Sequence, residues 1–207
     1  METGPLSTIR KNKIKDHLNK ENSSYQNTRL SIQLSLNGLS FCITDKVSQE
    51  LVEVQRLRFS TPRSENELRG ALNDFLESHN VPSRTYESVV VTHSNALFNI
   101  VPQALFDLSK LSDYVKFNAQ LLPHDELAYD TIAHKDMVVV YVPFTAVNNY
   151  IFDCFGPFDF KHHVALHLEE LLSIEHEAPE KVCYAHIDQG TLNLTVIKDK
   201  KLQFFNS

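Results

Sequence analysis

The chain has 207 residues, of which 42% are hydrophobic and 22% charged, and its formal net charge is −6. This is the composition of an ordinary globular protein, and it excludes collagen-like, coiled-coil and wholly disordered chains. No stretch approaches the roughly 20 apolar residues that cross a bilayer, and the sequence begins without the apolar core of a signal peptide. We therefore expect a cytoplasmic protein without a membrane span.

The charge is unevenly distributed along the chain. Residues 1–30 contain six Lys and Arg against three Asp and Glu, so the remainder is acidic. An acidic body argues against a nucleic-acid-binding surface. Because Asn, Ser and Lys dominate the start of the chain, we predict that residues 1–29 form a disordered basic leader.

The three cysteines are too few and too scattered for a disulfide framework or a zinc knuckle. Cys42, Cys154 and Cys183 each have apolar neighbours in the sequence. We predict three buried, free thiols.

Strict alternation of apolar and polar residues begins at Leu30 and is typical of a half-buried strand. The Asn37–Gly38 pair follows, which tolerates the positive φ angles of a two-residue hairpin turn. Alternation then resumes through Ile43, and a third strand is predicted around 51–59. The ordered part of the chain therefore opens with a three-stranded antiparallel meander.

A helix is predicted next, because Ser64 and Glu67 have the spacing of a capping box and apolar residues follow at helical spacing from Leu68 to Leu76. After Pro82 we predict a buried strand over 88–93, a short apolar stretch over 97–101 and small helical patterns over 103–118.

A strand is then expected over 126–132, followed by a β-branched run over 137–142. Such a continuous apolar run is typical of a central strand that is covered on both faces. We place this strand in one mixed sheet with the opening meander and the strand at Val89.

The last third of the chain has two helical patterns and a second group of strands. A helix is predicted from Val147 to Phe155, broken at Gly156, with 158–161 as an extended link. A second amphipathic helix ends near Ser173, and 174–180 form a charged linker. Residues 182–206 alternate as three strands separated by turns.

The two ends of the chain can be aligned with each other. Placing Gly190 over Gly38 superposes the first two strands of the last segment on those of the opening meander. Only the apolar pattern agrees, and two unrelated hairpins would also produce it.

The order of the elements resembles the actin-like ATPase superfamily, whose two ribonuclease-H-like halves each begin with three antiparallel strands. The segment 184–202 is similar to the second phosphate loop of the cell-division and pilus-assembly branches of that superfamily. The chain from Leu30 onward also resembles an uncharacterised bacterial domain-of-unknown-function family of the same fold. This second resemblance rests mainly on Tyr141-Val-Pro-Phe, on 148–156 and on Phe160-Lys-His162.

The resemblance implies an α/β fold with a ribonuclease-H-like mixed sheet and flanking helices. The first half would occupy residues 30–175, and 181–207 would form the start of a second, truncated half. The chain stops at Ser207, before the helices of the second half and before the glycine pair that contacts adenosine in the superfamily.

The resemblance also implies a nucleotide-phosphate site. Asp188, Gly190 and Thr191 match the second loop, in which backbone amides approach a phosphate and the aspartate holds magnesium through water. Asn37 and Gly38 stand at the first loop, where Leu36 replaces the expected aspartate. The 188–190 sequence also fits a plain tight turn with an exposed carboxylate.

Two functional hypotheses remain. The missing carboxylate favours a non-catalytic interaction module without a cofactor. The alternative is a phosphotransferase or ATPase that binds Mg-ATP and requires a longer chain. Since 182–206 is rich in apolar residues, we also expect a protein partner or a homodimer through this meander.

Other chemistry is not favoured by the sequence. His163, His167 and Glu170 share a helix stripe with metal-ligand spacing, but the glutamate that follows the first histidine in a zincin helix is missing. The cysteines have no basic neighbour, and no serine lies in a glycine-flanked elbow. We predict no metal site and no catalytic residue.

Overall fold

The structure is a computed structural model that describes residues 25, 27–117, 121–122, 125–132, 136–174, 181–188 and 191–207. Most of the predicted basic leader and of the charged linker at 174–180 lies outside these residues. No helix of the described part is long and apolar enough to cross a membrane.

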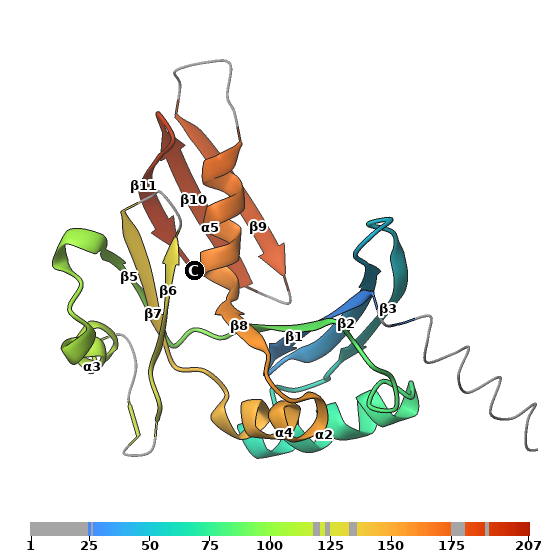
Figure 1. The fold of residues 1–207 in the computed structure, drawn as a ribbon. Coiled ribbons are helices and arrows are strands. Elements are labelled where there is room, and N and C mark those ends of the chain that lie inside the picture. Colours follow the sequence, from blue (N-terminus) through green and yellow to red (C-terminus); the bar gives the residue numbers. More distant parts are fainter. Residues whose placement is uncertain are drawn as a thin grey trace, which may run out of the picture.

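Eleven strands and four helices, with two short 3-10 turns, make up the described chain (Figure 1). The strands are β1 (Thr28–Ser35), β2 (Gly38–Asp45), β3 (Leu51–Arg58), β4 (Ser88–Ser94), β5 (Phe98–Pro102), β6 (Ala128–Ile132), β7 (Met137–Tyr141), β8 (Asp159–His162), β9 (Val182–Asp188), β10 (Thr191–Lys198) and β11 (Lys201–Asn206). The helices are α2 (Glu65–Ser78), α3 (Leu111–Val115), α4 (Thr145–Phe155) and α5 (His163–Ser173), and the 3-10 turns are Gln103–Leu105 and Leu108–Lys110.

The largest sheet of the described chain is mixed and has five strands in the order β3-β2-β1-β4-β8. The strands β1, β2 and β3 are an antiparallel meander, as predicted, whereas β4 is parallel to β1 and β8 is parallel to β4. The α/β fold with a mixed sheet and flanking helices is therefore confirmed.

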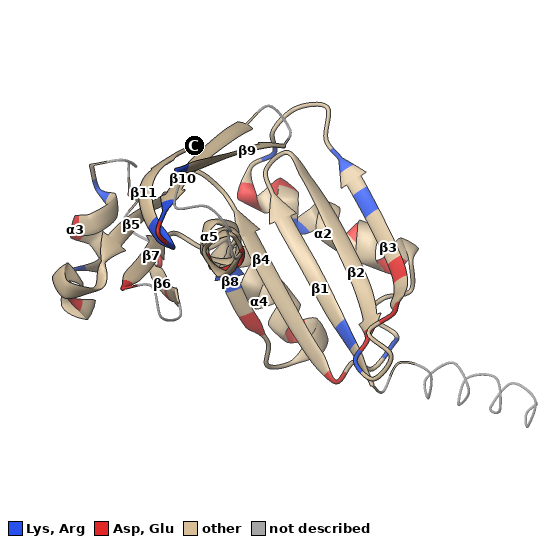
Figure 2. Ribbon diagram, turned by 90° about the horizontal axis from the view of Figure 1, so that it is seen from above, with Lys and Arg blue, Asp and Glu red and all other residues tan. Residues whose placement is uncertain are grey.

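Helices α2 and α4 cover one face of this sheet (Figure 2). The alternation of β1 directs Leu30, Ile32 and Leu34 toward these helices, and all three side chains are fully buried. They pack with the apolar stripe of α2, which includes Leu68 and Leu72. The periodicities of strand and helix thus produce one shared core.

The capping box of α2 is present as predicted. The Glu67 amide donates to Ser64 Oγ at 3.4 Å, and the Ser64 amide donates to Glu67 Oε2 at 2.8 Å. Helix α4 has no side-chain cap at its own N-cap residue, Phe144. Instead, the Ala146 amide donates to Glu65 Oε1 of α2 at 2.6 Å, which ties the two helix N-termini together.

The strand over 137–142 does not belong to the five-stranded sheet, so this part of the prediction is wrong. It is β7, the middle strand of an antiparallel sheet in the order β5-β7-β6. Val138, Val139 and Val140 are fully buried because one face packs toward α5 and the other toward α3. Coverage of both faces was predicted correctly, but burial does not reveal which strands pair.

The fifth strand of the mixed sheet is β8, which the sequence indicated only as an extended link. Its pairing partner is β4, with His93 opposite His162. Four residues with alternating charges give little local strand signal, so the pairing depends on a segment about 70 residues earlier in the chain.

The last three strands form an antiparallel meander in the order β11-β10-β9, as predicted. Helix α5 lies between this C-terminal meander and the β5-β7-β6 sheet (Figure 1). Its buried residues Leu168 and Leu172 pack in one cluster with Val139 of β7 and Ile197 of β10. Helix α5 therefore joins the two antiparallel sheets.

All three cysteines are free, but the prediction that they are buried is wrong. Cys42 and Cys154 are partly exposed and Cys183 is exposed. Cys42 follows Phe41 in β2, so its side chain points to the other face of the sheet, away from the core. Cys183 lies on an outer strand. Apolar neighbours in a strand alternate between faces, so they do not fix the burial of the residue between them.

Candidate functional site

The candidate site lies at the carboxyl ends of β1, β4 and β8, which meet at one edge of the five-stranded sheet. The register places Ser35 of β1 opposite Ser94 of β4, and His93 of β4 opposite His162 of β8. Ligands of open α/β sheets usually bind beyond the carboxyl ends of parallel strands. The groups at this edge are therefore the first candidates for a functional role.

The hairpin turn after β1 holds Leu36 and Asn37, because Ser35 pairs with Gly38. This is one position earlier than the predicted Asn37–Gly38 turn. The Asn37 amide donates to Ser35 Oγ at 3.1 Å. Leu36 is only partly exposed and packs against the main core.

The same turn is bound to the segment that follows β3. The Phe59 amide donates to the Asn37 carbonyl at 2.9 Å, and the Arg63 amide donates to the Leu36 carbonyl at 2.7 Å. Both carbonyls of the turn are thus already hydrogen-bonded within the chain. An apolar side chain stands at the position of the expected carboxylate.

The second predicted loop joins β9 to β10. Asp188 is the last residue of β9 and pairs with Thr191, the first residue of β10. Gly190 and the side chain of Asp188 lie outside the described residues. Both ribbon views place the tip of β9 near the end of β1 (Figures 1 and 2). The fold thus brings the end of β9 and the turn after β1 to the same side of the five-stranded sheet.

His93, at the end of β4, is fully buried. Its Nδ1 accepts a hydrogen bond from the Phe144 amide at 3.3 Å. Burial lowers the pKa of His93 to about 4, although the nearby Asn148 side chain opposes this shift. His93 Nε2 and Asn148 Oδ1 are both buried without a hydrogen bond of ordinary geometry, so the opposing effect is weak. His93 is neutral near pH 7.

His162, at the end of β8, is also fully buried, and its hydrogen bonds fix its tautomer. Its Nδ1 accepts from the Val164 amide at 3.4 Å, which caps α5, and its Nε2 lies 3.2 Å from the Asn95 carbonyl. An amide can only donate and a carbonyl can only accept, so the proton is on Nε2. Burial and the neighbouring His163 lower the pKa of His162 well below its usual value.

Asp130 of β6 completes this buried polar group. Its Oδ2 accepts from the His162 amide at 2.6 Å, and its Oδ1 accepts from the Tyr141 hydroxyl at 3.4 Å. Burial raises the pKa of Asp130 to about 6, while the His162 amide opposes the shift. Burial also raises the pKa of Tyr141.

Several of these residues belong to the sequence motifs at 141–144 and 160–162. The rings of Phe144 and Phe160 each lie 5.5 Å from the ring of His93, and the ring of Tyr141 lies 5.0 Å from that of His162. The sequence alone assigned these motifs no role. The available signal was limited to His93, which ends the apolar run at 89–91, because His162 follows a charged segment. The arrangement joins the sheets to α5 and is shielded from solvent.

The histidine stripe on α5 contains His163 and His167, with Glu170 on the same helix. Within the described ranges, no three His, Cys, Asp or Glu side chains converge to hold a metal ion. His167 instead lies beside His186 of β9, with ring centroids 5.4 Å apart. Burial and His186 lower the pKa of His167.

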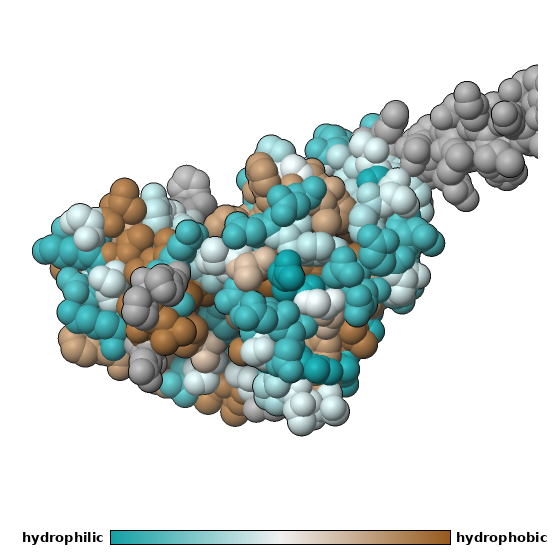
Figure 3. All heavy atoms as spheres, turned by 90° about the horizontal axis from the view of Figure 1, so that it is seen from below, coloured by the Kyte–Doolittle hydropathy of each residue, from teal (hydrophilic) through white to brown (hydrophobic). Residues whose placement is uncertain are grey.

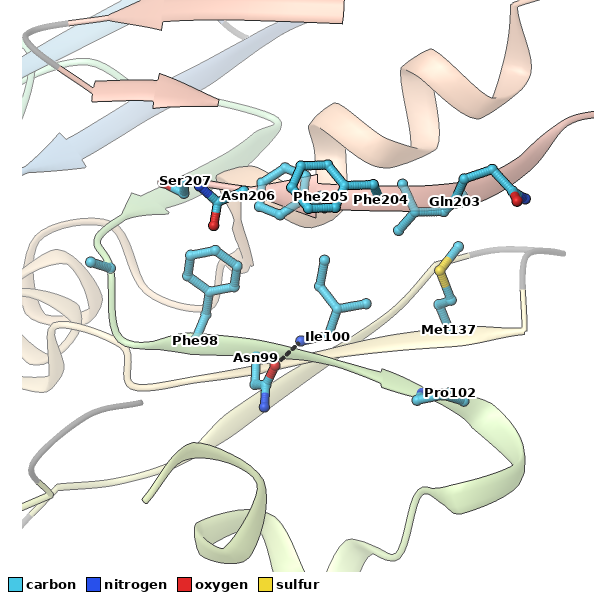
Figure 4. A pocket seen from close by; sticks show the side chains of 12 residues that line it. Phe98, Asn99, Ile100, Pro102, Met137, Gln203, Phe204, Phe205, Asn206 and Ser207 are labelled. Atoms are coloured by element: carbon cyan, nitrogen blue, oxygen red, sulfur yellow. Dashed lines mark hydrogen bonds between the residues drawn. The ribbon is translucent and has the colours of Figure 1, made fainter. Parts of the chain in front are cut away.

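A hollow of about 500 Å³ lies between β5 and β11 (Figure 4). Phe98, Ile100 and Met137 point into it from one side, and the Phe98 ring lies 6.0 Å from that of Phe205. None of its described lining residues carries a titratable side chain. The lining offers apolar contacts from its aromatic and aliphatic side chains and hydrogen bonds from Asn99, Gln203 and Asn206.

The sequence profile of the family described as "Protein of unknown function (DUF3822)" matches residues 16–207. The chain belongs to this family. None of the curated proteins matches this DUF3822 chain.

Among solved structures, this DUF3822 chain is similar to a Bacteroides thetaiotaomicron protein with an actin-like ATPase fold and unknown function. The two share 17% identity and superpose with a TM-score of 0.80 over 90% of this chain and 71% of that chain. The actin-like fold is therefore confirmed. The cytoplasmic domain of EpsL from the type II secretion system of Vibrio cholerae matches with a TM-score of 0.41 and 14% identity, covering 84% of this chain and 68% of that domain.

Proposed function

We propose that this DUF3822 chain is a non-catalytic interaction module with an actin-like fold that works in the bacterial cytoplasm. The observation that carries the proposal is the turn after β1, where Leu36 packs on the core and both turn carbonyls accept backbone hydrogen bonds. The free cysteines fit a reducing compartment.

The chemistry at the carboxyl ends of β1, β4 and β8 supports the proposal. Holding magnesium and phosphate requires oxygen ligands and free amide donors. The first turn offers a leucine, and its Asn37 amide already donates to Ser35. The histidines at the ends of β4 and β8 are buried and neutral. Those two groups therefore hold the scaffold together, and a bound nucleotide would have to be held without them.

The exposed surface supports an interaction role as well. Apolar surface gathers over the end of the molecule that carries α3 and the β5-β7-β6 sheet (Figure 3). Leu105, Leu108 and Phe117 are exposed there. Large exposed apolar patches often mark contacts with other proteins.

Isothermal titration of the full chain with Mg-ATP tests the proposal. We expect no saturable heat for the wild type, and the same result for Asp188→Ala and Asp199→Ala. Asp199 is an exposed carboxylate in the β10–β11 turn and serves as the matched control. Magnesium-dependent binding that is lost in Asp188→Ala but kept in Asp199→Ala would contradict the proposal. It would favour the alternative, a phosphotransferase or ATPase that requires a longer chain.

We further propose that the outer face of the C-terminal meander binds a second copy of this chain. Helix α5 covers only the face of β10 that carries Asn193, Thr195 and Ile197. On the other face, Leu192 lies opposite Ile187 and Val196 lies opposite Phe204. A two-fold contact through this face would remove the same apolar residues from water in both copies.

The variant Phe204→Glu tests this contact. Phe204 is 51% exposed, so a charge there leaves the core intact but opposes association. We expect the wild type to sediment as a dimer and Phe204→Glu as a monomer. Val47→Glu is the control, because Val47 is 79% exposed in the β2–β3 turn. A wild type that stays monomeric at high concentration would contradict the contact.

A further inference from the structure

A groove of about 720 Å³ runs between the edge strand β3 and helix α2. Its floor includes Leu57 and Phe59 from the β3 side and Phe75 from α2. Arg56, Arg58 and Arg63 also line the groove. Because β3 is the outermost strand of the five-stranded sheet, the groove follows an edge of that sheet.

Among the strands that the structure describes, none pairs with the outer edge of β3, since the sheet order begins at β3. The Phe59 amide donates to Asn37, and hydrogen-bonded pairs in antiparallel strands alternate. The amides of Leu57 and Gln55 therefore point toward β2. The amides of Arg56 and Arg58 point away from the sheet, toward the groove side, where another strand could pair with them.

The two faces of β3 differ in chemistry. Leu57 and Gln55 lie opposite Leu39 and Phe41, whose side chains are buried under α2. Arg56 and Arg58 point to the other face and are exposed. A strand added to β3 would place alternate side chains over the apolar groove and the remaining ones beside the arginines.

The charges in the groove are mainly positive. The lining contains three arginines, Arg56, Arg58 and Arg63, and one carboxylate, Asp74. Arg63 is engaged locally, because it stacks over the Phe59 ring at 5.3 Å and lies 3.9 Å from Glu67. An incoming segment with carboxylates would complement Arg56 and Arg58. A second copy of β3 would bring the same arginines into the groove.

We infer that β3 pairs with an extended segment of a partner protein in which apolar and acidic residues alternate. The apolar residues lie over Leu57, Phe59 and Phe75, and the acidic residues lie beside Arg56 and Arg58. This mode of recognition adds a strand to a sheet edge, with backbone hydrogen bonds for affinity and side chains for specificity. The inference rests on the proposed function, because it names the kind of partner that the module binds.

The probe is a fluorescent eight-residue peptide in which glutamate and valine alternate, titrated with the full chain and followed by anisotropy. We expect saturable binding that weakens as salt is raised. A peptide with lysine in place of glutamate should bind at least about tenfold more weakly. A glutamate–valine peptide with N-methylated amides on its pairing edge should not bind, because it cannot donate to β3.

The protein variants separate the arginines of the groove from charge in general. Arg56→Glu/Arg58→Glu should weaken binding by about tenfold or more. Arg69→Glu changes the charge at an exposed position of α2 that does not line the groove, and it should bind as the wild type does. The milder Arg56→Gln/Arg58→Gln variant replaces the reversal if the latter does not fold.

Hydrogen exchange shows where the peptide lies. Saturating peptide should slow exchange of the Arg56 and Arg58 amides, whereas the Leu57 amide is already bonded within the sheet. Absence of binding, equal binding of the lysine peptide, or binding that leaves these two amides unprotected would overturn the inference. Mg-ATP binding together with these peptide results would overturn only the non-catalytic proposal.

Discussion

Replacing Leu168 with alanine is expected to lower the free energy of unfolding by about 3 kcal/mol. Leu168 is fully buried in the middle of α5. It belongs to the apolar cluster that joins β6 and β7 on one side of the helix with β10 on the other. The truncation removes buried methyl groups and leaves a cavity where three elements meet, so the site has little freedom to collapse.

Urea unfolding followed by circular dichroism measures this effect. Glu170→Ala is the matched control, because Glu170 lies on the exposed side of the same helix. We expect its free energy of unfolding to stay within about 0.5 kcal/mol of the wild type. A similar loss of unfolding free energy in both variants would mean that interactions within α5 stabilise it and that packing in the apolar cluster does not.

The second prediction with a large expected effect is that the free energy of unfolding decreases as the pH is lowered. His93 has a pKa of about 4 in the folded chain and an ordinary value of 6.5. Between these values the unfolded chain binds a proton that the folded chain does not, so stability falls as the pH decreases. The loss from His93 is about 3 kcal/mol between pH 7 and pH 4. His162, whose pKa is also lowered by burial, acts in the same direction.

Asp130 acts in the opposite direction. Its pKa is about 6 in the folded chain, against an ordinary value of 3.8 for a free side chain. The folded chain therefore binds the extra proton between these values, and the contribution of Asp130 to stability increases as the pH decreases. This opposing contribution is about 2 kcal/mol between pH 7 and pH 4.

Two variants separate these contributions. In His93→Asn, the new amide oxygen can accept from Phe144 but does not titrate, so we expect the loss between pH 7 and pH 4 to shrink by about 3 kcal/mol. In Asp130→Asn, the opposing contribution is gone, so the loss should grow by about 2 kcal/mol. Urea unfolding across this pH range compares the slopes. Parallel pH profiles for the three proteins would contradict the assignment.

The elements predicted from the sequence are those whose signals are local. The capping box at Ser64 and the alternation from Leu30 depend on residues within a few positions of each other, so the helix and the hairpins follow directly. Strand β8 and the partners of β7 depend on segments far along the chain, and neither burial nor alternation identifies a partner strand.

The candidate site likewise contains one feature that the sequence reveals and one that it does not. The leucine at position 36 can be read directly, and it indicates the missing carboxylate. The polar group of His93, His162 and Asp130 could not be predicted, because its members come from three strands and acquire their lowered or raised pKa values only through tertiary burial.

The junction between β8 and α5 has a mechanical consequence. His162 is the last residue of the strand and the capping residue of the helix, with no residue in between. Any rotation of α5 relative to the five-stranded sheet would have to break either the cap or the pairing of His162 with His93. We therefore expect helix and sheet to reorient as one rigid unit in solution. Residual dipolar couplings of α5 and of β4 should fit a single alignment tensor.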